Sequence, residues 1–595
     1  MKLINRILSP FIAWRLRHVS HRNFILLLSV AIGVVVGIFA VGVKLLVYEV
    51  NALVTSLKVD TSFVLLFFLP FIGILITNFL AKNIFKETLG HGVTNVLLNI
   101  SKGSSLIRKR LFLSRIMTSI VSVSFGGSVG LEAPLIISGS AFGSNLGRLM
   151  HLHYKSRTLL IGCGSAAAIA GIFNSPIAAV IFVLEVILSE INIDKFIPIL
   201  ISSICASLAS TFLLHDEALF NFVIQDELII SDLPFYIALG VVCGLVALYF
   251  TRIHYWVEGK LKSIESNSQR MIIGGLALSI IIFVFPSMYG EGYETIKALL
   301  NGNHQAIASH ELLFSDMHIS GSILVIVTLL ILLKAIASAS TIGAGGSGGI
   351  FAPSLFTGGL VGYLLTQVSL WAGFTRTLSV SNFTLLGMCG VLTGVLHAPL
   401  TGVFLIAEIT GGYTLFVPLM LVSTLAYITI RIFEPHSIYT KHLIEKGDLI
   451  VGNKDKEILS LIEKKKLIEK NDPVFLLSDT LDKAIEVIQS SERLTFAVVD
   501  DKYHLKGVIN WEDIKSIVFS QHRDQNMTVK TVMHNAKILI FESDSSSEIM
   551  AKFEKSGKWC LPTLKSDGTF AGFIYKETLF KNYRERLIKQ YESEL

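Results

Sequence analysis

The residue with the clearest chemical potential is a glutamate inside an apolar region, Glu132 in the run Gly130-Leu131-Glu132-Ala133-Pro134. Glycine before it and proline after it favour the start of a helix at this point. A helix N-terminus presents free N–H groups and a partial positive charge, which stabilise an anion. We therefore predict that Glu132 places its carboxylate where a permeating anion would bind. A structural carboxylate satisfied by local N–H groups is the alternative.

Glycine-rich turns precede apolar runs at three places: Gly90-His91-Gly92-Val93, Gly126-Gly127 with Gly130, and Gly345-Gly346 with Gly348-Gly349. Each turn can bring backbone N–H groups close to a ligand. Together they predict short broken helices that aim their N-termini at one anion site. Partial charges suit transport because a full buried charge would hold the anion too tightly.

The elements that position these residues occur twice in the chain. The landmarks of the first half are Gly130–Pro134, Gly139, Gly143, Pro176 and Glu185, and those of the second half are Gly349–Pro353, Gly358, Gly362, Pro399 and Glu408. The prolines lie 42 residues apart in the first half (134 to 176) and 46 apart in the second (353 to 399). Two structural copies are the usual plan of a secondary transporter.

The composition predicts a membrane protein. Of 595 residues, 52% are hydrophobic and 16% are charged, and the mean hydropathy is +0.63, whereas soluble proteins carry about 25% charged residues. Runs such as 24–50 and 235–257 are long enough to span a bilayer, and we expect 24–50 to be a retained membrane helix and not a signal peptide. The runs 125–138, 342–357 and 392–408 are interrupted by glycine and proline. Such breaks are tolerated at membrane depth where the backbone lines a cavity.

The composition changes at Glu434-Pro435, where charged residues become frequent. We predict an N-terminal segment at 1–22, a membrane domain at 23–434 with repeats at about 23–215 and 233–434, a charged linker at 435–470, and a soluble tail at 471–585. The stretches 102–115, 148–157 and 252–270 are basic, whereas 287–319 has one lysine against four acidic residues. The positive-inside rule then places the basic stretches and both termini in the cytoplasm.

Other residue classes argue for simple roles. The net charge of +6 gathers beside apolar segments, so we expect no nucleic-acid partner. The five cysteines are scattered without metal-ligand spacing and should be small buried hydrophobes. The loop histidines His304, His310 and His318 are expected to be solvated side chains, and no metal site is predicted.

The tail contains two copies of one α/β unit. The first has a helical pattern at 481–488, strands at 495–499 and 505–509, and a helix from Trp511. The second has a helix at 548–554 and strands near 560–564 and 570–574, joined by the turn Ser566-Asp567-Gly568. Gly507 and Gly572 mark the same point in each unit, 65 residues apart (507 to 572).

The order Gly-x-Gly-Val, Gly-x-Glu-x-Pro, Phe-Asn-x-Pro, Gly-Ile-Phe-Ala-Pro and a later tyrosine resembles the CLC family of voltage-gated-type chloride channels and chloride/proton antiporters. The tail resembles a CBS-domain pair, and the resemblance covers about 23–585. It implies an α-helical polytopic fold of two inverted repeats with broken helices, followed by a cytoplasmic α/β CBS pair. It also implies a homodimer in the plasma membrane (the inner membrane of a bacterium), with one pore for chloride or a similar anion in each subunit and no required cofactor.

The resemblance also implies roles for individual residues. Glu132 would be the gating glutamate, which occupies the anion path and leaves when protonated or displaced. Ile350 and Phe351 would offer backbone N–H groups to the central anion, and Tyr413 its hydroxyl. The implied anion-binding set is Gly90, His91, Gly92, Gly130, Gly349, Ile350, Phe351 and Tyr413.

The chain departs from the family pattern at His91, where the family has a serine that coordinates the anion, and at Thr94, where it has a proline. The imidazole can donate to an anion through either ring nitrogen, or it can point away and leave the site to backbone groups. Both alternatives stay open, and so does the preference among chloride, nitrate, bromide and fluoride. Leu131 and Ala133 also depart, but Glu132 is kept.

Val186 stands where many exchangers have the acid that relays protons from the cytoplasm. Valine cannot carry a proton, and Glu185 should point elsewhere because adjacent helical side chains diverge by about 100°. We therefore predict a passive chloride channel. A proton-coupled antiporter is the alternative, since some exchangers also lack the acid. A membrane sensor or enzyme is more remote, because no nucleophile–base pair, metal cluster or phosphate loop is evident.

CBS pairs often bind adenine nucleotides, with a Thr or Ser after a strand and an Asp three residues later that holds the ribose. After Gly507-Val508-Ile509 the chain has Asn510 and keeps Asp513. After Gly572-Phe573-Ile574 it has Tyr575, and Thr578 in place of the aspartate. Half of the signature is present, so a nucleotide site that includes Asp513 and a purely structural tail are equal alternatives.

Overall fold

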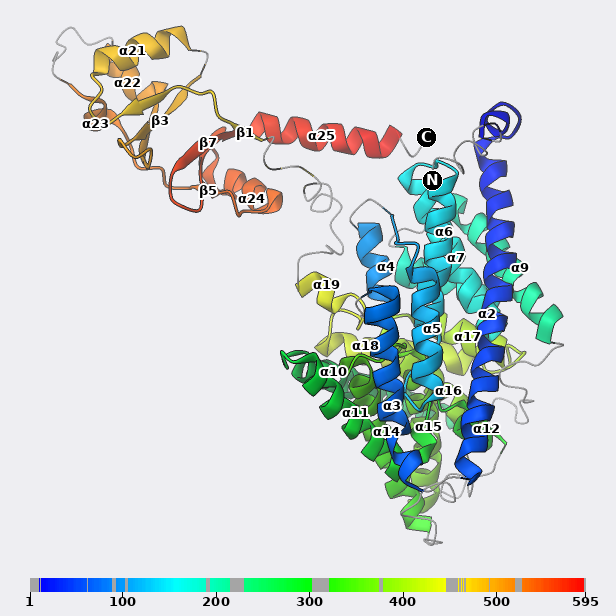
Figure 1. Cartoon of the computed structure of the whole chain (residues 1–595). Helices are drawn as coiled ribbons and strands as arrows, with labels where there is room; N and C mark the ends of the chain where they lie inside the picture. Colours follow the sequence, from blue (N-terminus) through cyan, green and yellow to red (C-terminus); the bar gives the residue numbers. More distant parts are fainter. Residues whose placement is uncertain are drawn as a thin grey trace. The chain divides into compact units, whose positions relative to one another are not determined.

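The structure of the chain is a computed structural model (Figure 1). It divides into two compact units, Met1–Leu449 and Ile450–Leu595, each of which is considered by itself. The division falls inside the predicted charged linker. The structure describes residues 12–60, 63–87, 92–101, 105–188, 193–214, 230–301, 320–373, 378–445, 467–491, 493–518 and 527–592, with residues 10, 459, 462 and 464.

The first unit is helical and consists of two inverted repeats. The helices of the first repeat, blue to cyan in Figure 1, are α2 (His21–Asp60), α3 (Phe63–Phe79), the π-helical turn η1 (Leu80–Phe85), α4 (Gly92–Ser101), α5 (Leu111–Ser124), α6 (Glu132–Leu149), α7 (Tyr154–Phe173), α8 (Pro176–Phe182), the π-helical turn η2 (Val183–Ile187) and α9 (Ile193–Leu214). Those of the second repeat, green to yellow, are η3 (Ile230–Asp232), α10 (Leu233–Lys262), α11 (Asn267–Val284), η4 (Pro286–Met288), α12 (Tyr293–Leu300), α14 (Ser320–Gly343), α15 (Phe351–Trp371), α16 (Val380–Leu396), α17 (Pro399–Ile409) and α18 (Phe416–Phe433). The short α19 (Lys441–Glu445) follows α18.

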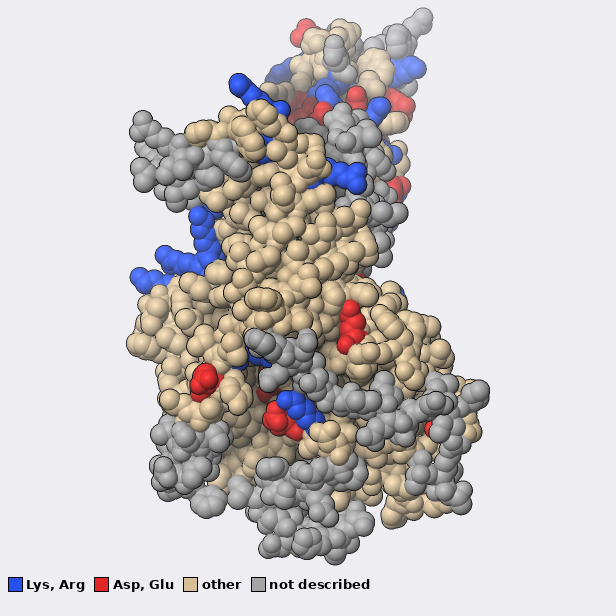
Figure 2. Space-filling model, turned by 90° about the vertical axis from the view of Figure 1, so that its right-hand side faces the viewer, with Lys and Arg blue, Asp and Glu red and all other residues tan. Residues whose placement is uncertain are grey.

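Eight helices among the described residues are long and apolar enough to cross a membrane. Uncharged residues dominate the face of the membrane unit that Figure 2 presents. The fold is therefore the predicted polytopic one, with the breaks in the predicted places. One expectation was wrong: α6 has 18 residues and α15 has 21, so the helices that begin at two of the glycine-rich turns are not short.

The repeated glycines lie where the central helices pack closely. A Cβ built on Gly139 of α6 would lie 2.1 Å from the carbonyl oxygen of Gly164 on α7. In the second repeat, a Cβ on Gly358 of α15 would lie 2.3 Å from the carbonyl oxygen of Gly387 on α16. The absence of a side chain lets the backbones of each helix pair touch, as small residues do in membrane bundles.

The ends of α7 and α16 are also equivalent in the two repeats. Both helices end at a residue in the left-handed conformation, Asn174 (φ 53°) and His397 (φ 56°). Pro176 and Pro399 then occupy the first position of α8 and α17, where their fixed φ suits the start of a helix. The predicted repeat is thus present in the backbone itself.

The second unit is an α/β tail consistent with a CBS pair. One sheet has the order β2-β3-β4 and the other β1-β7-β6-β5. In each of these two sheets a parallel pair of strands (β2 with β3, β5 with β6) adjoins an antiparallel hairpin (β3 with β4, β6 with β7). The elements are β1 (Ile468–Glu469), β2 (Val474–Leu476), α21 (Leu481–Ser490), β3 (Thr495–Val499), β4 (Leu505–Asn510), α22 (Trp511–Val518), α23 (Val529–Val532), β5 (Ile540–Phe541), α24 (Ser546–Ser556), β6 (Cys560–Leu564), β7 (Phe570–Tyr575) and α25 (Lys576–Glu592).

Candidate anion site

The two repeats meet at a pair of glycines. The N–H of Gly130 donates to the carbonyl of Gly349 at 2.8 Å, and the N–H of Gly349 donates to the carbonyl of Gly130 at 2.8 Å. These residues stand just before α6 and α15. The reciprocal bonds therefore hold the N-termini of the two helices next to each other.

Left-handed glycines direct the chain into this bridge. After α5 the chain turns at Gly126 (φ 98°), and after α14 it turns at Gly345 (φ 97°). A side chain at either position would be strained and would also collide, since a Cβ on Gly126 would lie 2.7 Å from the Tyr289 ring and one on Gly345 2.4 Å from Asn78 Nδ2. The glycine-rich turns thus permit the approach of the two helix ends.

Glu132 is the first residue of α6 and is 1% exposed. Its Oε1 accepts a hydrogen bond from the Tyr293 hydroxyl at 2.5 Å, and the backbone N–H groups of Glu132 and Ala352 act on the carboxylate. A Cβ on Gly130 would lie only 1.9 Å from Glu132 Oε2. The carboxylate therefore lies over the glycine bridge, between the N-termini of α6 and α15. It is a negative group held where helix ends stabilise negative charge.

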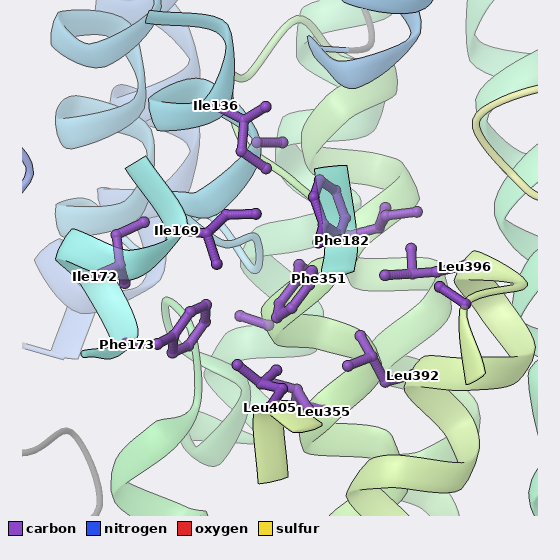
Figure 3. Packing of buried hydrophobic residues seen from close by; sticks show 14 of the residues in the cluster. Ile136, Ile169, Ile172, Phe173, Phe182, Phe351, Leu355, Leu392, Leu396 and Leu405 are labelled. Atoms are coloured by element: carbon purple, nitrogen blue, oxygen red, sulfur yellow. The ribbon is translucent and has the colours of Figure 1, made fainter. Parts of the chain in front are cut away.

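Phe351 is the first residue of α15, just after the Gly130–Gly349 bridge, and its ring packs with two other phenylalanine rings (Figure 3). Its ring lies 5.4 Å from that of Phe173 at the end of α7 and 6.4 Å from that of Phe182 at the end of α8. Ile350 and Phe351 are 3% and 1% exposed. The packing fixes the start of α15, whose free N–H groups face the same region as those of α6.

The carboxylates of Glu185 and Glu408 hold the short helices α8 and α17 together. Glu185 follows α8 and accepts bonds from the N–H of Leu400 (3.2 Å) and from the N–H (2.9 Å) and hydroxyl (2.7 Å) of Thr401 on α17. Glu408 of α17 accepts bonds from the N–H groups of Ile177 (2.9 Å) and Ala178 (2.8 Å) on α8. Each glutamate caps the N-terminus of the other helix, so Glu185 does point away from the place of the missing acid. Val186 is half-buried in η2.

Gly92 begins α4 and lies against α6, because a Cβ there would lie 2.5 Å from Ile137 and 3.2 Å from the Ala133 carbonyl oxygen. Gly90 and His91 lie outside the described residues, as do His304, His310 and His318. Among the described residues no group of three His, Cys, Asp or Glu side chains is arranged to hold a metal ion.

The prediction that the Tyr413 hydroxyl lies at this site was wrong, because the structure places Tyr413 elsewhere. Its side chain is 56% exposed, with its ring against Phe416 at 5.6 Å. The tyrosine that does lie close by is Tyr439, which is 4% exposed and near enough to Glu132 for an electrostatic interaction. Within the described part of the chain no group hydrogen bonds to its buried hydroxyl.

Three contacts fix the backbone around Tyr439. The Thr94 hydroxyl of α4 donates to the Tyr439 carbonyl at 3.1 Å, and the Tyr255 hydroxyl of α10 donates to the Ile438 carbonyl at 2.6 Å. The N–H of Ile438 donates to the Val395 carbonyl of α16 at 3.5 Å. Thr94, which departs from the family pattern, therefore links the start of α4 to this tyrosine.

An ion-pair cluster secures the segment that carries Tyr439. Glu434 accepts from Arg252 Nε at 2.9 Å and from Lys441 Nζ at 2.8 Å. Burial acts to raise the pKa of Glu434, but the bonds from Lys441 and Arg252 outweigh it, and the pKa lies below its usual value. The sequence signal for this segment was the apolar Ile438-Tyr439 pair, which lies beyond the membrane boundary predicted at 434.

In the tail, Asp513 stands at the start of α22 as predicted. One carboxylate oxygen accepts from the N–H of Asn510 at 2.9 Å and from its side-chain amide at 3.2 Å, and the other lies 3.2 Å from His534 Nε2. The equivalent point in the second α/β copy of the tail differs. There Thr578 donates to Glu469 at 3.0 Å, and the Tyr575 hydroxyl donates to Asp472 at 2.8 Å.

Comparison with known proteins assigns the membrane unit to a family. Residues 72–431 match the family described as voltage gated chloride channel. The chain belongs to the CLC family. A putative chloride channel protein ClcB-like of Ralstonia nicotianae is 26% identical over 365 residues, 60% of this chain and 80% of the relative. The voltage-gated ClC-type chloride channel ClcB of Escherichia coli is 27% identical over 335 residues, 56% of this chain and 75% of the relative.

Solved CLC structures share the fold. A slow cyanobacterial Cl-/H+ antiporter aligns with a TM-score of 0.59 at 20% identity, over 72% of this chain and 98% of its own. A CLC-type fluoride/proton antiporter aligns with a TM-score of 0.58 at 23% identity, over 70% and 97%. A eukaryotic CLC transporter aligns with a TM-score of 0.61 at 16% identity, over 94% and 99%. The last alignment extends over most of the chain, tail included.

Proposed function

We propose that this integral membrane CLC protein transports chloride or a similar small anion through a pore in each subunit, with Glu132 as the gate. The observation that carries the proposal is the Glu132 carboxylate, buried over the Gly130–Gly349 bridge between two helix N-termini. A group that binds negative charge in the resting protein can bind a permeating anion once the carboxylate leaves. The names of the ClcB relatives support chloride.

The proposed anion-binding groups are the backbone N–H groups of Ile350 and Phe351 and the Tyr439 hydroxyl. The N–H groups supply partial charges at the start of α15. The Tyr439 hydroxyl is buried and has no bond within the described residues, and a buried polar group in that state has a ligand to gain. Gly92, at the start of α4, adds a third helix end close to α6. His91 keeps its proposed role as a donor to the anion, with the backbone alone as the alternative.

The gate is tested with Glu132→Gln, which mimics the protonated carboxyl. In liposomes that contain the reconstituted protein, the variant should carry chloride and lose most of the pH dependence that a protonatable gate gives the parent. A variant with the parent's pH dependence would end the gating assignment, and a parent without anion flux would end the transport proposal.

The finer proposal is passive conduction. Val186 offers no proton carrier, and the Glu185 carboxylate is engaged with the N-terminus of α17. A proton crossing the apolar inner half would need an acid or a water chain. A chloride gradient should therefore drive no uphill proton movement in liposomes. Uphill proton movement that Glu132→Gln abolishes would establish the antiporter, with another carrier in place of the missing acid.

The same proposal covers assembly and location. We expect a homodimer in the plasma membrane, which is the inner membrane if the source is bacterial, with both termini in the cytoplasm. Apolar side chains exposed on α8, α9, α17 and α18 offer a surface that lipid or a second copy would cover: Ile177, Leu208, Phe212, Leu400 and Val417. Cross-linking in native membranes distinguishes the two, since a monomer would yield no dimeric product.

We propose that an adenine nucleotide binds only the first of the two α/β copies of the tail, the copy that contains Asp513. Asp513 is partly exposed and keeps the carboxylate that a ribose would need. In the second α/β copy of the tail the Tyr575 hydroxyl donates to Asp472, and Arg493 pairs with Glu469 and Asp472 and lies over the Tyr575 ring, so these groups already bond one another. Calorimetry of the full protein with ATP and AMP tests this, and no heat at millimolar nucleotide would leave a structural role.

A further inference from the structure

The segment Gly290–Tyr293 lies against the N-terminal end of α6, where Glu132 stands. Gly290 (φ 62°) and Gly292 (φ 86°) are both in the left-handed region, and a Cβ on Gly292 would lie 2.5 Å from the Phe356 ring of α15. Glycine is required for so close an approach. The segment therefore places Glu291 and Tyr293 directly against the start of α6.

Glu291 and Tyr293, on either side of Gly292, hold the adjacent residues Leu131 and Glu132. The Tyr293 hydroxyl donates to Glu132 Oε1 at 2.5 Å, and Glu291 Oε1 accepts from the N–H of Leu131 at 3.1 Å. Tyr293 is 8% exposed and Glu132 is 1% exposed, so water has little access to this bond. A hydrogen bond from a phenol to a buried carboxylate is among the stronger kinds.

Among the described residues, few charged or titratable groups lie around Glu132. Glu291 and Tyr293 face it from the segment before and at the start of α12, and Tyr439 lies on another side. Lys334 of α14 is completely buried, donates to the carbonyls of Met288 (3.3 Å) and Gly290 (3.4 Å), and acts on Glu291, as does Lys44 of α2. The hydroxyl of Tyr293 is thus the neutral donor placed on the carboxylate itself, whereas the ammonium of Lys334 secures the segment.

We propose that Tyr293 is a latch for the gate: its hydroxyl holds the Glu132 carboxylate in the anion path and sets how readily a proton or an anion displaces it. The inference rests on the proposed gating role of Glu132. The phenol donates to the Glu132 carboxylate, and this bond stabilises the ionised form more than the protonated form, because a charged acceptor makes the stronger hydrogen bond. Loss of the hydroxyl therefore favours protonation and departure of the carboxylate, and also favours the competing anion.

The test is chloride flux from liposomes against external pH for Tyr293→Phe and its matched control, Tyr289→Phe. The Tyr289 hydroxyl is also on this segment but donates to the Ser124 carbonyl at 2.5 Å. Tyr293→Phe should move the pH of half-maximal flux upward by about one unit, equal to about a tenfold weaker hold on the ionised carboxylate. It should also lower the half-saturating chloride concentration. Tyr289→Phe should leave the midpoint at the parent's value.

Double variants separate this inference from the gating proposal. In the Glu132→Gln background, Tyr293→Phe should cause no further shift, because no ionised carboxylate remains to be held. A shift that persists there, or a Tyr293→Phe midpoint equal to the parent's, overturns the latch while the gate stands. A Glu132→Gln variant that titrates like the parent removes the gate itself.

A substitution that keeps the shape of Tyr293 covers the case in which Tyr293→Phe does not fold. Replacement of Tyr293 by 3-fluorotyrosine makes the phenol a stronger donor with almost no change in volume. The midpoint should then move downward, opposite to the effect of Tyr293→Phe. An unchanged midpoint in the folded fluorinated protein counts against the latch.

Discussion

The buried hydroxyl of Tyr439 leads to different expectations for stability with and without chloride. Within the described residues this hydroxyl has no hydrogen-bond partner. A buried unpaired polar group costs about 1–3 kcal/mol. In a chloride-free medium, Tyr439→Phe should therefore leave the thermal stability equal to the parent's or higher.

Chloride should reduce this advantage of the variant. If the hydroxyl donates to the anion, its loss removes about 1.5 kcal/mol of binding free energy, or about tenfold in Kd. At saturating chloride the ligand would then stabilise the variant by about 1.4 kcal/mol less than the parent, since ligand stabilisation follows the logarithm of concentration over Kd. The gain from the missing hydroxyl and the loss of anion binding have opposite signs, so the two media separate them.

The assay is thermal unfolding in detergent while chloride replaces gluconate at constant ionic strength. Tyr413→Phe is the control, because that side chain is 56% exposed and away from the site. Tyr439→Phe should show a smaller rise in Tm with chloride, and Tyr413→Phe the parent's rise. The reasoning fails if Tyr439→Phe is destabilised without chloride and responds to chloride as the parent does, because the hydroxyl would then be structural.

Two further expectations concern packing and the tail. Gly139→Ala places a Cβ 2.1 Å from the Gly164 carbonyl oxygen, against an ordinary carbon–oxygen contact of about 3.3 Å, so α6 and α7 must separate and unfolding should become easier by about 1–3 kcal/mol. Gly42→Ala, with nothing within 4 Å of the new Cβ, should not lower the Tm. The N–H of His504, with Lys506 adding to it, holds the pKa of Asp500 at about 2. Because that pKa is depressed, the stabilisation should be present above about pH 4 and fade as the pH falls toward 2. Hydrogen exchange of the β3–β4 turn should show this in the parent and not in Asp500→Asn, and equal protection at all pH values in both would contradict it.

The repeat and the breaks were predictable because glycine and proline restrict the backbone locally. Gly126 and Gly345, Pro176 and Pro399 recur at matching positions, and the turns they predict are present. The lengths of α6 and α15 were harder to predict from the sequence. In α6, for example, nothing in the local pattern distinguishes a helix that stops at Ser138 from one that continues to Leu149. The continuation is stabilised by packing against α7, the next helix of the chain, and this tertiary contact cannot be read from the local pattern of α6.

The site was predictable only in part, for the same reason. Glu132 carries its own signal, a carboxylate in an apolar run. Tyr293 carries none, because it is a single aromatic residue in a mixed segment, and Tyr439 carries only the weak signal of the apolar Ile438-Tyr439 pair. They reach the site only through the glycine turns at 290–292 and through the contacts of Glu434 with Arg252 and Lys441. Tyr413 was predicted from the family resemblance, but its segment ends at the surface, where the ring packs on Phe416.

The bridge between Gly130 and Gly349 has a consequence for biogenesis. The two partners are 219 residues apart (130 to 349), and each donates a backbone bond to the other. During synthesis Gly130 enters the bilayer long before its partner exists, and Glu185 must likewise wait for Thr401. The first repeat therefore resides in the membrane with polar helix ends that only the second repeat can satisfy. The proposed anion site is a late product of assembly, and a chain truncated before residue 349 keeps Glu132 but lacks the helix end that completes the site.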